Sequence, residues 1–152
     1  MGSAAKSLEE TVDYLNDHGE NVGMVSVHLM RPWANKHFQS ALPPTCNKIA
    51  VLDKTREDGA AGMPLYLDVN VAMSDANRQT LITGGQYGLA SKEFTPAMAK
   101  AVFDNLNADN PRMKYVVGID DDITHSSLDY GSPIHTTPRT TRQCLFWGLG
   151  SD

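Results

Sequence analysis

Side chains that could do chemistry gather most densely in the stretch GIDDDITHSS, residues 118–127. Asp120, Asp121 and Asp122 stand in a row, and His125 follows three residues later. Carboxylates beside a histidine could hold a divalent metal ion or supply an acid/base pair. Consecutive residues at a strand end point to opposite sides, so at most two of the three carboxylates converge. The spacing therefore favours a hydrogen-bonded rim, which caps the following turn or docks a neighbouring surface, over a metal site.

A second candidate is the glycine-rich stretch GGQYGLASK, which begins at Gly84. It lacks the Gly-Lys-Ser/Thr ending of a phosphate loop and does not match G-x-G-x-x-G. Glycines do let backbone amides approach a ligand closely. A structural turn is the favoured interpretation. The alternative is a free-standing small-ligand domain that binds coenzyme A or a nucleotide through Gly84, Gly85 and Gly88.

Composition sets outer limits on the function. The chain has 152 residues, enough for at most one ordinary domain, and carries a net charge of −5. The sequence contains no basic run, which disfavours a nucleic-acid partner. It also has no apolar stretch that approaches the roughly 18–20 residues of a membrane span. Cys46 and Cys144 are too few for an iron–sulfur cluster or a cysteine-rich zinc site, and they fit a reducing cytosol.

The apolar periodicity predicts alternating helices and strands that would position these residues. Residues 64–76 fit both periods, but Pro64 and the length of the segment favour a helix. Thr95 and Pro96 have the residue types of a helix N-cap and first helical position. The predicted elements, in order, are helix 4–18, strand 22–30, helix 34–42, strand 48–53, helix 64–76, strand 80–83, a helix from 96 and strand 113–120. This order predicts an α/β fold with a mostly parallel sheet and helices on both faces.

The polar clusters all follow predicted strands, so they should share the carboxyl edge of the sheet. Open α/β sheets bind their ligands or partners at that edge. No complete catalytic set is present, and no residue is assigned to catalysis, to a cofactor or to a metal. The candidate rim for contacts with neighbouring domains consists of Arg31, Gly84, Gly85, Asp120, Asp121, Asp122, Thr124 and His125.

Three longer stretches carry a family resemblance. They are RPWANKHFQSALPPTCNKIAVLDKTREDGAAGMPLYLDV, ITGGQYGLASKEFTPAMAKAVFDNL and VVGIDDDITHSSL. Together they resemble the second domain of pyruvate:ferredoxin (flavodoxin) oxidoreductases, and the terminal CLFWGLGSD resembles the start of the next domain. The unit around Arg31-Pro32 is also similar to the carboxy-terminal domain of transketolase-like enzymes. The resemblance implies a three-layer α/β/α sandwich and favours a helix at 64–76.

The resemblance also implies an activity for the whole enzyme. Such enzymes decarboxylate pyruvate on thiamine diphosphate with magnesium, form acetyl-CoA from coenzyme A, and pass electrons through [4Fe-4S] clusters to ferredoxin or flavodoxin. A related fusion that reduces NADP is a further alternative. The expected assembly is a homodimer in the cytoplasm, or in an organelle of an anaerobic eukaryote. This chain lacks the Gly-Asp-Gly…Asn motif and the cluster cysteines, so its implied role is that of a non-catalytic scaffold.

The chain is therefore expected to be a fragment. Residues 1–128 would form the transketolase-like domain, and residues 129–152 a connector and the start of the next domain. The helix at 4–18 has no strand in front of it, so the first strand of the domain is expected to be missing.

Overall fold

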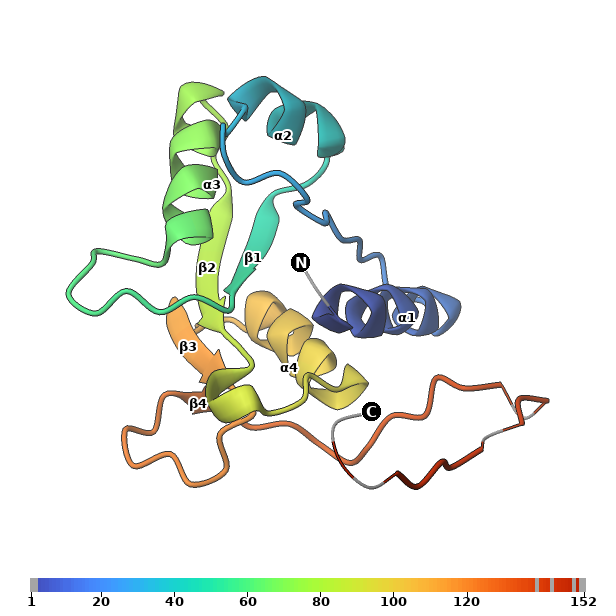
Figure 1. Cartoon of the computed structure of the whole chain (residues 1–152). Helices are drawn as coiled ribbons and strands as arrows, with labels where there is room; N and C mark the ends of the chain where they lie inside the picture. Colours follow the sequence, from blue (N-terminus) through green and yellow to red (C-terminus); the bar gives the residue numbers. More distant parts are fainter. Residues whose placement is uncertain (1–2, 139, 143, 149, 151–152) are drawn as a thin grey trace.

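A parallel sheet forms the centre of the protein. The computed structural model describes residues 3–138, 140–142, 144–148 and 150. Within these residues the sheet contains, in spatial order, β1 (Lys48–Asp53), β2 (Leu81–Gln86), β3 (Lys114–Val117) and β4 (Ser127–Leu128) (Figure 1). Each neighbouring pair of strands is parallel. The predicted α/β fold with a parallel sheet is confirmed.

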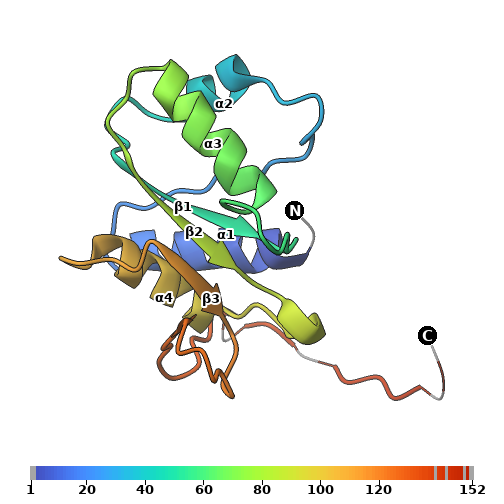
Figure 2. The same ribbon diagram turned by 90° about the vertical axis from the view of Figure 1, so that its left-hand side faces the viewer.

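Helices cover both faces of this sheet. Figure 2 shows one layer of helices above the sheet and another below it. The upper pair is α2 (Asn35–Ala41) and α3 (Pro64–Asp75), and the lower pair is α1 (Ser3–Asp17) and α4 (Pro96–Asn107). A short 3-10 helix, η1 (Leu89–Ser91), follows β2. The result is the three-layer arrangement that the family resemblance implied.

Alternation along β1 divides the interior into two cores. Val51 and Ile49 pack with α2 and α3, whereas Ala50 and Leu52 face the core built around α4. Successive side chains on a strand point to opposite faces, so a strand covered on both sides is apolar throughout. The run KIAVLD has that character, which is why the sequence identified β1 correctly.

Local sequence patterns correctly predicted where two helices begin. Pro64 and Pro96 each occupy the first turn of their helix, where a missing backbone N–H costs nothing. The Thr95 hydroxyl accepts a hydrogen bond from the backbone N–H of Met98 at 3.4 Å, as the N-cap prediction requires. Both helices lie where the sequence predicts them.

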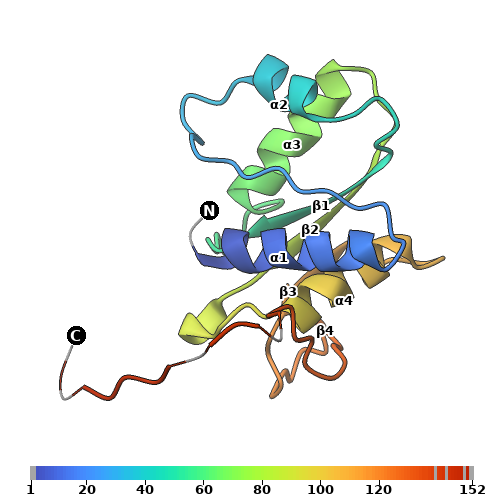
Figure 3. The ribbon, with the colours of Figure 1, turned by 90° about the vertical axis from the view of Figure 1, so that its right-hand side faces the viewer.

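The strand predicted at residues 22–30 is wrong. This segment runs from α1 to α2 without a ladder partner (Figure 3). Val25 and Leu29 are 41% and 68% exposed, so the apolar alternation is not used to form a buried strand face. Strand propensity shows that residues fit a pleated surface, but a strand also needs a neighbouring backbone to pair with. β1 is the edge strand on this side, and residues 22–30 do not pair with it.

Two further differences concern the strands. β2 extends to Gln86 and includes Gly84 and Gly85, which the sequence placed in a loop after the strand. Both glycines pair in the sheet, with Val51 and Leu52 of β1. The sequence also missed β4, whose two residues are too few to show a period.

The two glycines of β2 receive tyrosine rings from opposite faces. A Cβ atom at Gly84 would lie 2.9 Å from a ring carbon of Tyr66, on α3. A Cβ atom at Gly85 would clash with the ring of Tyr115 and lie 2.8 Å from a methyl of Leu52. Glycine is required at these positions because the space of a side chain is already filled.

Replacement of Gly85 by alanine should therefore destabilise the fold. Overpacking of this kind typically costs about 1–3 kcal/mol. We expect the Gly85→Ala chain to unfold at a lower urea concentration than the wild-type chain. Gly23→Ala is the matched control, because a Cβ atom there meets nothing within 4 Å. Equal midpoints for the two variants would contradict the packing role of Gly85.

Candidate functional site

The loop after β3 is organised by the carboxylate of Asp122. Its Oδ1 atom accepts hydrogen bonds from the backbone N–H and the hydroxyl of Thr124, at 2.9 and 2.5 Å. Its Oδ2 atom accepts from the backbone N–H groups of Ser126 and Ser127, both at 2.5 Å, and from the Ser126 hydroxyl at 3.2 Å. Asp side chains stabilise turns by such local bonds. Asp122 thus holds the turn that follows it, and the role of the rim at a neighbouring surface stays a prediction.

These bonds favour the charged form of Asp122. The Thr124 hydroxyl makes the largest contribution and the loop amides add to it, so together they hold the pKa of Asp122 well below its usual range, against a smaller opposing effect of desolvation. Asp122 is therefore ionised at neutral pH and engaged with its own loop.

The base of the loop is fastened to β3. The Arg112 guanidinium donates to the carbonyl oxygens of Ser127 at 2.7 Å and His125 at 3.4 Å. The backbone N–H of Val116 donates to the carbonyl of Ser126 at 3.0 Å. His125 itself has a φ of 53°, in the left-handed region that non-glycine residues rarely adopt. Its side chain is exposed, so the structure holds this backbone in place and presents the ring to solvent.

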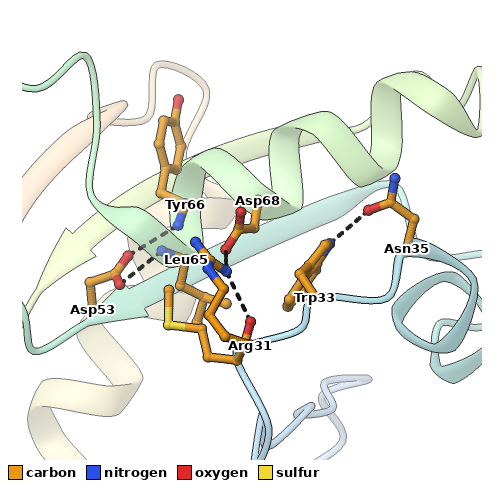
Figure 4. Close-up of polar contacts among 8 residues, drawn as sticks. Arg31, Trp33, Asn35, Asp53, Leu65, Tyr66 and Asp68 are labelled. Atoms are coloured by element: carbon orange, nitrogen blue, oxygen red, sulfur yellow. Dashed lines mark hydrogen bonds and ion pairs between the residues drawn. The ribbon is translucent and has the colours of Figure 1, made fainter.

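A second polar group lies at the amino end of α3, as Figure 4 shows. The Asp53 carboxylate accepts hydrogen bonds from the backbone N–H groups of Leu65 and Tyr66, each at 3.1 Å. The N-cap residue Met63 supplies no side-chain bond, so Asp53 satisfies donors that the helix leaves free. Burial raises the pKa of Asp53, and these two hydrogen bonds oppose that rise. Asp53 is thus an anchor for the helix.

Arg31 lies on the same side of the sheet as this anchor (Figure 4). Its guanidinium pairs with Asp68 of α3 at 2.5 Å and donates to the carbonyl of Met30 at 2.9 Å. The Arg31–Pro32 peptide bond is cis. Because residues 22–30 form no strand, Arg31 does not follow one as predicted, and its place beside α3 comes from the ion pair with Asp68.

The structure divides the predicted rim into three parts. Arg31 lies beside α3, which packs on the edge strand β1. The loop of residues 120–125 follows β3, toward the other edge of the sheet. Gly84 and Gly85 lie inside β2 under tyrosine rings. The predicted common edge therefore presents two separate polar groups, and the two glycines lie in the strand between β1 and β3.

The small-ligand alternative finds little support in these surroundings. One cavity of about 250 Å³ adjoins Gly84 and Gly85, below the range of about 300–1,000 Å³ that is typical of ligand sites. Lys114 lines it, but its ammonium donates to the carbonyl of Ala61 at 2.7 Å. Another cavity, of about 290 Å³, is lined by Asp120 and Asp129, whose charges would repel a phosphate.

The described residues contain no cluster that suits a metal ion. Within residues 3–138, 140–142, 144–148 and 150, no three His, Cys, Asp or Glu side chains gather closely enough to hold one. Cys46 and Cys144 are both free thiols. Two separate thiols do not fit the ligand set of an iron–sulfur cluster, which takes four thiolates.

Sequence reasoning missed two features of the site. The bonds from Asp53 to α3 span 12 and 13 residues, a separation that no local pattern reveals. Ile123 is 92% exposed within an otherwise polar loop, and the sequence analysis did not single it out. The only sequence signal for Ile123 was its place among turn-forming residues.

Comparisons with known proteins agree with this architecture. A parallel sheet between two helical layers defines an α/β domain, and this architecture is consistent with the transketolase carboxy-terminal type that the resemblance implied. The family described as pyruvate:ferredoxin oxidoreductase core domain II matches residues 1–98. The chain belongs to this family.

Relatives match over the whole chain. A pyruvate:ferredoxin oxidoreductase of Moorella thermoacetica is 51% identical over 152 residues, and a putative pyruvate-flavodoxin oxidoreductase of Synechocystis is 49% identical. These alignments cover 100% of this chain and 13% of each relative. A mitochondrial pyruvate dehydrogenase [NADP(+)] of Euglena gracilis is 45% identical, with 9% of its length covered. The chain thus spans about an eighth of the length of the bacterial relatives.

The Asp122 bonds predict a specific acid sensitivity. An ordinary aspartate has a pKa of about 3.9, and the pKa of Asp122 in the folded loop is lower. Its stabilising contribution is therefore present above about pH 4 and is lost as the pH falls toward the folded pKa. At pH 6 we expect the Asp122→Asn variant to melt at a lower temperature than the wild type. At pH 3 we expect the difference in melting temperature between the two proteins to be smaller.

Asp121→Asn is the control for this experiment, because the Asp121 side chain is 92% exposed. It should leave the melting temperature nearly unchanged at both pH values. A constant difference between Asp122→Asn and wild type across this range would show that the Asp122 carboxylate does not stabilise the loop through its charge.

Proposed function

We propose that this chain is a non-catalytic scaffold domain of a pyruvate:ferredoxin or pyruvate:flavodoxin oxidoreductase. The observation that carries the proposal is the match of the entire chain, at about 50% identity, to a domain-sized part of such enzymes. The geometry supports a scaffold, since the carboxylates Asp53 and Asp122 are engaged in holding a helix and a loop.

The whole enzyme, in this proposal, oxidatively decarboxylates pyruvate to acetyl-CoA. Thiamine diphosphate, magnesium and [4Fe-4S] clusters would supply the chemistry, and coenzyme A would be a substrate. The described residues hold no metal-binding cluster and the chain has two cysteines, so in this proposal other parts of the polypeptide bind these groups. Ferredoxin or flavodoxin would accept the electrons. Relatives named for NADP suggest that parts outside this chain set the acceptor.

We place the domain at residues 1–128 and treat residues 129–152 as a connector that leads into the next domain. Support comes from β4, the last strand among the described residues, which ends at Leu128. We also propose that the enzyme is a homodimer of the cytoplasm, or of an organelle as the name of the Euglena relative indicates for that protein. None of the helices in the described part has the length and apolar character that a bilayer crossing requires.

The loops at the carboxyl edge would dock neighbouring domains of the same polypeptide. Both exposed groups, Arg31 with Asp68 and the loop of residues 120–125, are held by several hydrogen bonds before any partner arrives. Preorganised surfaces lose less entropy on contact, which suits a permanent interdomain interface.

Detection of the native polypeptide tests the proposal directly. A chain that is 13% of the whole corresponds to a polypeptide of roughly 1,200 residues. We expect an antibody raised against this chain to detect a protein of that length, and the immunoprecipitate to oxidise pyruvate with coenzyme A. A native product of only 152 residues would contradict the assignment to a longer enzyme.

Substitutions in the rim separate scaffolding from chemistry. We expect Asp121→Ala and His125→Ala, made in the full-length enzyme, to lower the fraction of assembled protein while kcat per assembled enzyme stays unchanged. Sedimentation velocity measures assembly, and pyruvate turnover measures activity. Asp109→Ala, at an exposed position in the bend after α4, is the control. Loss of turnover with full assembly would argue that the rim takes part in catalysis.

A further inference from the structure

The loop after β3 presents one large apolar side chain to solvent. Ile123 is 92% exposed, whereas its neighbours in the loop are polar. A single exposed apolar residue is common on protein surfaces and needs no explanation by itself. Ile123 differs because of how firmly the backbone around it is held.

The backbone on the carboxyl side of Ile123 is fixed by the preceding residue. Asp122 accepts hydrogen bonds from the backbone N–H groups of Thr124, Ser126 and Ser127, so the chain bends tightly around its carboxylate. Arg112 clamps the base of the bend through two carbonyl oxygens. The tip that carries Ile123 is therefore preorganised, and a β-branched side chain adds stiffness of its own.

The surroundings of the tip carry negative charge. The Asp121 side chain is 92% exposed. Its carboxylate forms a long ion pair with the Lys92 ammonium, at a distance of 3.8 Å. Asp120 is exposed and accepts a hydrogen bond from the Tyr130 hydroxyl at 2.7 Å, which leaves its charge in place. A surface that complements this tip would combine an apolar depression with positive charge at its border.

We propose that Ile123 is an anchor residue that inserts into an apolar depression bordered by Lys or Arg on another domain of the same polypeptide. The inference rests on the proposed function and deepens it, because it names the contacting side chain and the chemistry of the opposing surface. Anchors of this kind sit at the centre of an interface, and charged groups around them set the register. Asp121 would be the charged group that sets the register here.

Thiol labelling tests the contact in the full-length enzyme. Ile123→Cys removes an exposed side chain, so folding should not suffer, and peptide mass spectrometry follows reaction of that one thiol with a maleimide. We expect its labelling to be at least about tenfold slower than that of Lys6→Cys, which lies on the exposed face of α1. Adding Asp121→Lys to Ile123→Cys should restore much of the labelling rate, because it places like charges together.

The outcomes separate this inference from the proposed function. Rapid labelling of Ile123→Cys in an active enzyme of about 1,200 residues would overturn the anchor and leave the family role intact. Protection that appears only after ferredoxin or flavodoxin is added would also overturn it, since the partner would then be the electron carrier. Protection without the carrier, relieved by Asp121→Lys, is the result expected. If the antibody detects no longer polypeptide, the proposed function itself fails, and that result is obtained before any labelling experiment.

Discussion

The fold depends on two adjacent glycines of β2, Gly84 and Gly85, where no side chain projects from the sheet. Tyr66 reaches Gly84 from one face, and Tyr115 covers Gly85 from the other. A ring from α3 and a ring from the neighbouring strand β3 thus lie directly against the backbone of β2. Burial raises the pKa of Tyr115 to about 12, so its hydroxyl stays neutral near Thr83, with the two oxygens 3.4 Å apart. The two glycines leave room for the tyrosine rings to pack in the cores on both faces of the sheet.

Much of this architecture was readable from local sequence. Pro64 and Thr95-Pro96 marked helix starts, and the apolar run at residues 48–53 marked a strand buried on both faces. Such signals act within a few residues, which is the range that a sequence pattern can cover. Residues 22–30 show the limit of this reasoning, because pairing depends on a backbone elsewhere in the chain. Gly84 and Gly85 show another limit, since their role depends on the rings that cover them.

The candidate site was predictable to a similar degree. The sequence located the loop after β3 and favoured a hydrogen-bonded rim there over a metal site. It did not show that Asp122, of the three carboxylates, is the one that organises the loop, or that Asp53 anchors α3. Both facts depend on which carboxylate faces which amides, and that is decided by the path of the backbone. The family resemblance supplied the expected role, and the contacts explain how the domain holds its two polar groups in place.

The Asp53 anchor has a consequence for how this domain can vary among organisms. Its bonds to Leu65 and Tyr66 fix both ends of the segment 54–63 to the sheet and the helix. Because the entropy of closing a loop grows only slowly with its length, a longer connection between these ends should cost little stability. This segment is therefore a position where lineages can gain or lose residues while α3 keeps its register. The domain can acquire new surface there without re-evolving its core.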